Sequence, residues 1–139
     1  MTIATTSKPT SDTFFEQSCI TFEAAFDSPP QAFIDSVDAT APGFGHRIVK
    51  TEFEHVYNRR VLDLKNRELC INVSSAALDG TGSGAVRMHI SAALRHGATR
   101  AETTEVQMQV GMAAGLPASL SALQVARETF DAMDTTTPV

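Results

Sequence analysis

Apolar residues recur at helical spacing along nearly the whole 139-residue chain. The first set steps by four, three and four positions, which places its members on one face of a helix: Phe15, Cys19, Phe22 and Phe26. Only Cys70-Ile71-Asn72-Val73 has the β-branched character of a strand, and no partner strand is visible elsewhere. The sequence therefore predicts an all-α fold of about seven helices.

Turn and capping residues divide this pattern. The first helix must end before Pro29-Pro30, and Ser28 can cap the second, which Ala41-Pro42-Gly43 closes. A third helix is expected over 44–57, followed by a loop over 58–62 and a fourth helix that is capped by Asp63 and ends near residue 78. The fifth helix ends at Gly97. The sixth is opened by the capping box Thr99-Arg100-Ala101-Glu102 and ends at Gly115, and the seventh starts at Pro117.

Each helix is expected to bury the apolar stripe that its spacing defines. The expected inward residues are Phe33, Ile34 and Val37; Val49, Phe53 and Val56; Leu69, Val73 and Ala76; Val86, Ile90 and Ala93; Val106, Val110 and Ala113; Leu120, Leu123, Ala126, Phe130 and Met133. The glycine-rich stretch 79–84 lacks the Lys-Ser/Thr of a phosphate-binding loop, so we interpret it as a flexible connection between helices.

The length and an apolar content of 42% fit one domain, expected over residues 13–133, with a disordered N-terminal tail at 1–12 and a polar C-terminal tail at 134–139. A net charge of -5 without any basic run disfavours binding to nucleic acid or to an anionic membrane. The first twelve residues contain no apolar signal segment, and no run is long enough to span a bilayer. We therefore expect a cytoplasmic protein.

The cysteine and histidine patterns do not suggest a metal centre. Cys19 and Cys70 are far apart and neither belongs to a Cys-x-x-Cys pair, so both are expected to be buried as small apolar residues. No His-x-x-x-His pair or acidic cluster has ligand spacing, and we therefore predict no metal.

Several segments in order resemble one family. They are Leu62-Asp63-Leu64-Lys65-Asn66-Arg67-Glu68-Leu69, then the His89–Glu102 block with its His-x-x-x-Ala-Leu-x-x-Gly-x-Thr-Arg pattern, then Gly115-Leu116-Pro117-Ala118 and the segment 122–130. Together they resemble the carboxymuconolactone decarboxylase family of the alkylhydroperoxidase-D-like superfamily. The similarity is clearest over 62–130 and extends faintly back to Phe44.

The resemblance also excludes one activity. The peroxidase branch of this superfamily carries Cys-x-x-Cys-x-x-x-His, and the matching positions here are Gly82, Ala85 and His89. Without these two thiols we expect no thiol peroxidase activity. His89 is retained, and the acidic position of the family matches Glu68.

The family resemblance implies a carbon-carbon lyase that decarboxylates a carboxymuconolactone without a cofactor. Such a reaction needs a proton donor and a cationic anchor around a dienolate. His89 borders the apolar stripe of its helix, where a lone histidine is more often structural, but the family pattern favours a proton-transfer role with Glu68 orienting it or favouring its charged form. Arg59 and Arg60 are the candidates for binding a substrate carboxylate, and His55 and Tyr57 are further candidate substrate contacts.

Two other functions stay open at this point. The same histidine and acid could shuttle protons on another small carbonyl substrate, as in an isomerase, cyclase or hydrolase of a biosynthetic pathway. The chain could also be a non-catalytic oligomeric binding protein that kept the fold. In either case the resemblance implies a homo-oligomer, a trimer or a hexamer of trimers, and the apolar faces of the first and last helices support this expectation.

Overall fold

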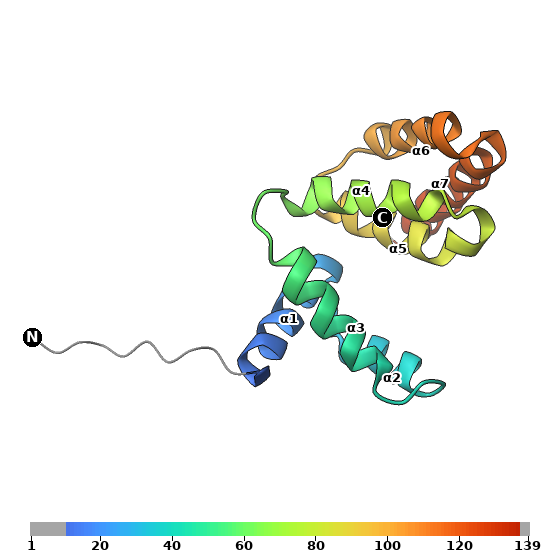
Figure 1. Ribbon diagram of the computed structural model, residues 1–139. Helices are drawn as coiled ribbons and strands as arrows, with labels where there is room; N and C mark the ends of the chain where they lie inside the picture. Colours follow the sequence, from blue (N-terminus) through green and yellow to red (C-terminus); the bar gives the residue numbers. More distant parts are fainter. Residues whose placement is uncertain (1–10, 137–139) are drawn as a thin grey trace, which may run out of the picture. The chain divides into compact units, whose positions relative to one another are not determined.

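The computed structural model describes residues 11–136 and contains seven α-helices joined by short connections, with no strand in this range (Figure 1). The all-α prediction is therefore confirmed, and Cys70–Val73 is helical. The expected tails differ in extent: α1 begins at Ser11 and α7 continues to Thr136, while residues 1–10 lie outside the described residues.

The helices form two compact units, one up to Val61 and one from Leu62 onward. The single domain expected over 13–133 stays a prediction, because a division in packing does not show that two parts unfold separately. None of the described helices is long and apolar enough to cross a membrane.

The first unit is built around aromatic side chains. It contains α1 (Ser11–Phe26), α2 (Gln31–Asp38), α3 (Phe44–Glu52) and a π-helical turn at Phe53–Tyr57. Phe22 packs against Phe53 with ring centroids 5.0 Å apart, and Phe53 stacks on Tyr57 at 4.3 Å. Such pairs stabilise a core beyond the area that they bury.

The π-helical turn changes which residue faces this core. The expected stripe placed Val56 inside, but the amide of Asn58 donates to the carbonyl of Phe53, five residues earlier. The wider turn rotates the following residues, so that Tyr57 is buried and Val56 is 46% exposed. The prediction for Val56 is wrong for this reason.

The start of α2 also differs from the expectation. Pro30, not Ser28, occupies the N-cap position and no side chain caps the helix. α1 ends at Phe26, and the next residue, Asp27, has a φ of 54°. This left-handed residue reverses the chain before the prolines, which leaves Ser28 in the connection rather than at the helix end.

The second unit consists of α4 (Leu64–Ala76), a 3₁₀ turn (Asp79–Gly82), α5 (Ser83–Arg95), α6 (Arg100–Ala114) and α7 (Leu116–Thr136). α4 packs mainly on α5 and α6 mainly on α7, while α7 also covers α5 (Figure 1). The predicted ends are confirmed: Asp63 caps α4, the Thr99 capping box opens α6, and Gly97 and Gly115 adopt positive φ after α5 and α6.

The buried faces of this unit are smaller and more polar than the expected stripes. α5 buries Val86, Ile90 and Ala93 as predicted. In α7 the predicted Leu120 is 63% exposed and the predicted Ala126 is buried, and the other buried residues are Ala118, Ser119, Ala122, Val125 and Thr129. α6 and α4 similarly turn polar residues inward. Ala113 is exposed, so its prediction is wrong, whereas Leu69 and Val73 are half-buried and Val73 packs against the core.

The physical reason for the α7 result is the close approach of α6. A Cβ atom at Gly111 of α6 would lie only 3.3 Å from the Cβ of Ser119 of α7. At this separation leucine cannot fit between the helices, so leucines lie at the margins and small residues fill the interface.

The glycine-rich connection makes a similar close contact. A Cβ atom at Gly82 would overlap with the carbonyl oxygen of Ser75, in the last turn of α4. The 3₁₀ turn Asp79–Gly82 is thus in close contact with α4, and the flexibility expected for 79–84 stays a prediction.

Candidate functional site

Glu68 and His89 form a buried pair between α4 and α5. His89 Nδ1 lies 2.6 Å from Glu68 Oε2, and the two side chains are 6% and 0% exposed, respectively. Both face the α4–α5 interface because they lie on the inward sides of two helices that pack along their length. The structure therefore brings together the two residues predicted to act in proton transfer.

The chemistry of the two groups sets the direction of this hydrogen bond. An ionised carboxylate only accepts hydrogen bonds, so Nδ1 of His89 carries the hydrogen when Glu68 is charged. The bond fixes the orientation of the imidazole ring, and in this tautomer Nε2 is the ring nitrogen that carries the lone pair. This is the arrangement that a general acid or base requires.

Further polar side chains are buried next to the pair. Asn72, one helical turn after Glu68, donates through Nδ2 to the carbonyl of Val86 at 2.9 Å, one turn before His89. Gln107 of α6 donates through Nε2 to Oδ1 of Asn72. Apolar periodicity gave no sign of these residues, since a search for apolar stripes skips polar positions.

Arg67 is a third residue that the sequence reasoning missed. Its side chain is buried at the start of α4, and Nη2 donates to the carbonyl of Leu62 at 3.3 Å. A guanidinium is rarely buried unless it is paired, so the sequence alone gave no reason to expect its burial. It places a cationic group in the same unit as the Glu68–His89 pair.

The other predicted site residues belong to the first unit. Arg59, Arg60 and His55 are exposed, and Tyr57 is buried against Phe53. Arg60 lines a small cavity of about 330 Å³ together with Phe14, Gln17, Glu54 and Asn58. The roles assigned to these four residues in substrate binding stay predictions.

The cysteines are placed differently from the expectation. Cys70 is exposed and Cys19 is half-buried, and both are free thiols. Burial and then the charge of Glu16 raise the pKa of the Cys19 thiol, which favours its unreactive protonated form. Cys70 lies on the side of α4 opposite Glu68, so the prediction that it is buried is wrong.

The positions that match the superfamily's thiols are occupied by Gly82 and Ala85. A cysteine at position 82 would meet the same carbonyl oxygen of Ser75 that excludes a Cβ atom. The backbone as well as the residue types therefore differs from what a dithiol at this place requires.

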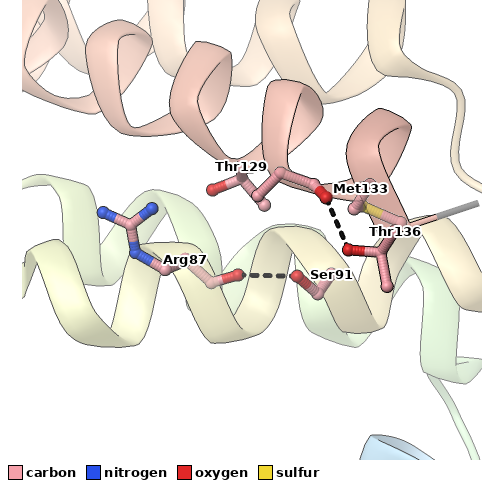
Figure 2. A pocket seen from close by; sticks show the side chains of 6 residues that line it. Arg87, Ser91, Thr129, Met133 and Thr136 are labelled. Carbon is pink, nitrogen blue, oxygen red and sulfur yellow. Dashed lines mark hydrogen bonds between the residues drawn. The ribbon is translucent and has the colours of Figure 1, made fainter.

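The grooves on the surface of the second unit include the following two. One, of about 410 Å³, lies between α5 and α7 (Figure 2) and is lined by Arg87, Ser91, Thr129, Ala132, Met133 and Thr136. The other, of about 580 Å³, is lined by Leu62, Asn66, Leu69, Cys70, Val73, Ser74 and Val106. Neither groove is lined by Glu68 or His89, whose side chains point to the opposite sides of their helices.

Within the described residues, no group of three or more His, Cys, Asp and Glu side chains could together hold a metal ion.

Comparison with known proteins gives three similarities. The model of the carboxymuconolactone decarboxylase family matches residues 42–128. An uncharacterized 15.0 kDa protein of Paracoccus denitrificans, from the intergenic region between nqo9 and nqo10, is 34% identical over 79 residues, which is 56% of this chain and 58% of that protein. The matched part thus spans less than two thirds of this curated relative.

The third similarity is structural. A crystal structure from Burkholderia xenovorans LB400, of a protein proposed to be a carboxymuconolactone decarboxylase, superposes with a TM-score of 0.62 at 20% identity. The match covers 93% of this chain and the whole of that one. At this identity the likeness supports the fold alone.

Proposed function

Because this chain belongs to the carboxymuconolactone decarboxylase family, we propose that it is a cofactor-independent decarboxylase acting on a carboxymuconolactone-like lactone or a related unsaturated carboxylic acid. The observation that carries this proposal is the hydrogen bond between His89 and Glu68, whose side chains are almost completely buried. Charged side chains are almost never fully buried unless they are paired, and a buried pair of titratable groups is a candidate functional site.

The reaction would proceed by loss of CO₂ and then protonation. The bond between the ring carbon and the carboxylate breaks, and its electron pair moves through the ring double bond into the lactone carbonyl, giving a dienolate. His89, protonated on both ring nitrogens, would deliver the proton from Nε2 to carbon and become neutral, while Glu68 keeps the ring oriented through Nδ1. A well-placed acid contributes about 10² to 10⁴-fold in rate.

The cationic anchor for the substrate carboxylate is assigned first to Arg59. We expect Arg59→Ala to raise KM with a smaller loss in kcat, because a contact made equally in the ground state and the transition state supports binding rather than chemistry. Steady-state kinetics on the protein's substrate would measure both constants. Arg47→Ala, which removes another exposed arginine of the same unit, is the control. An unchanged KM in Arg59→Ala would move the assignment to Arg60 or Arg67.

A homo-oligomer, either a trimer or a hexamer of trimers, is part of the same proposal. Met112, Leu116 and Leu120 follow one another at intervals of four residues near the α6–α7 turn, and they are 88%, 70% and 63% exposed. Apolar side chains gathered in this way are costly in water and are typical of subunit contacts.

Light scattering should therefore give three or six times the chain mass of 14.9 kDa, and the double variant Leu116→Asp, Leu120→Asp should lower that mass. A wild-type protein that stays at 14.9 kDa at micromolar concentration would contradict the oligomer.

The direct test of the proposed reaction is CO₂ release from carboxymuconolactone by the purified protein. Turnover that is lost in His89→Gln supports a decarboxylase. Binding of a small carboxylic acid without CO₂ release favours an isomerase, cyclase or hydrolase that uses the same proton-transfer pair on another carbonyl compound. If neither turnover nor proton exchange of any bound acid occurs, the chain is a binding protein of the same fold.

A further inference from the structure

The buried polar residues beside the Glu68–His89 pair form a continuous series across the second unit. Ser119 of α7 donates to the main-chain carbonyl of Gln107 at 2.9 Å, the Gln107 amide donates to Asn72, and Asn72 donates to the carbonyl of Val86. We call these three side chains and that carbonyl the amide network. It links α7 to α6, α6 to α4, and α4 to α5.

The amide network meets the two helices of the pair at adjacent turns. Asn72 follows Glu68 by four residues on α4 and therefore lies on the same helix face as Glu68. Val86 precedes His89 by three residues on α5 and shares its face in the same way. The Asn72–Val86 hydrogen bond therefore fixes the turns that carry Glu68 and His89 relative to each other.

Gln107 determines which way the Asn72 amide points. Because Gln107 Nε2 donates to Asn72 Oδ1, the Asn72 NH₂ group is directed toward Val86. The opposite orientation of Asn72 would bring two NH₂ groups together and two carbonyl oxygens together. Gln107 thus holds Asn72 in the only orientation that bonds α4 to α5.

This arrangement carries a cost in stability. Gln107 is fully buried, and its Oε1 has no hydrogen-bond partner among the residues that the structure describes. An unsatisfied buried acceptor is unfavourable, but an apolar side chain of similar size would only move the deficit to Oδ1 of Asn72, which would lose its donor. The benefit of the Gln107 amide must therefore lie in the hydrogen that it donates.

We infer that Asn72 and Gln107 are positioning residues, which hold the imidazole of His89 at hydrogen-bonding distance from Glu68 through the amide network. The inference rests on the proposed function only for its catalytic consequence, since the geometry of the pair can be measured without any substrate.

The test uses Gln107→Met, which keeps the approximate shape of the side chain but cannot donate. It removes the unsatisfied Oε1 of Gln107 and leaves Oδ1 of Asn72 unsatisfied instead, so the number of such buried atoms stays the same and the melting temperature should change little. Thr103→Val is the matched control. Thr103 is also buried on α6, one turn earlier, but its hydroxyl donates to the main-chain carbonyl of Thr99 at the start of the same helix.

The readout is the downfield proton resonance of the His89 Nδ1–H bonded to Glu68, identified by its absence in His89→Gln. We expect Gln107→Met to weaken this resonance and speed its exchange with water, while Thr103→Val leaves it unchanged. Asn72→Asp, which keeps the acceptor for Gln107 but lacks the donor to Val86, should have the same effect as Gln107→Met and decides the matter if the methionine variant does not fold.

An unchanged resonance in the folded variants would overturn the inference. With carboxymuconolactone as the probe, Gln107→Met should lower kcat by about tenfold with little change in KM, because a small misplacement of a reacting group is costly to the chemical step. If the wild-type protein does not turn over this probe, the proposed function fails, but the resonance still decides whether the amide network positions the pair.

Discussion

His89→Gln should lower kcat by about 10² or more while the protein remains folded. Glutamine has a similar reach and can still hydrogen-bond to Glu68, but it cannot deliver a proton near neutral pH. The largest expected effect in the molecule is therefore on the rate of chemistry and not on binding. Steady-state kinetics with carboxymuconolactone would measure kcat and KM, and far-UV circular dichroism would show whether the variant is folded.

The matched control for this variant is His96→Gln. It makes the same chemical change at the C-terminal end of the same helix, where His96 occupies the C-cap position, and it should leave kcat unchanged. Normal turnover by His89→Gln would show that the buried histidine is structural. The search for the proton-transfer group would then move to His55 and Tyr57.

Gly82→Ala is expected to have the largest effect on stability. The added methyl group would overlap with the Ser75 carbonyl oxygen, which is held in place by its hydrogen bond from the amide of Leu78. Overpacking usually costs about 1–3 kcal/mol, and a clash with fixed backbone lies at the upper end of that range or above it. For a chain of this length the melting temperature should fall by roughly 10 °C or more.

Gly84→Ala is the comparison for this measurement. A Cβ atom at Gly84 meets nothing within 4 Å, and the residue lies inside α5, so alanine there should stabilise the helix by about 0.5–1 kcal/mol. Thermal unfolding of both variants would separate the close contact from the general effect of replacing a glycine. Equal melting temperatures would contradict the tight packing of the 3₁₀ turn.

The helices were predictable because their ends carry local signals. Asp63, Thr99 with Glu102, Gly97 and Gly115 each act within one turn of the chain, and the structure places all of them at the predicted helix ends. The position of Ser28 outside the N-cap and the exposure of Val56 could not be predicted from such local signals. The positive φ of Asp27 and the π-helical turn at Phe53–Tyr57 have no local sequence signal comparable to a capping residue.

The candidate site was predictable only where a family pattern was available. That pattern indicated Glu68 and His89 by their positions, and the structure places them 2.6 Å apart. Arg67, Asn72 and Gln107 escaped notice because burial of a polar side chain depends on contacts between helices far apart in the sequence. A polar residue that interrupts an apolar stripe is the only sequence signal that could have suggested them.

Because small residues fill the interface between α6 and α7, this interface tolerates smaller side chains better than larger ones. Alanine, glycine and serine side chains have little left to remove, so truncation can cost little, whereas any enlargement meets the opposing helix. A saturation scan of positions 111, 118, 119 and 122 should therefore show losses that increase with side-chain volume. Substitutions tolerated at these interface positions would then be confined to exchanges among the smallest residues, even if the exposed leucines beside the interface vary freely.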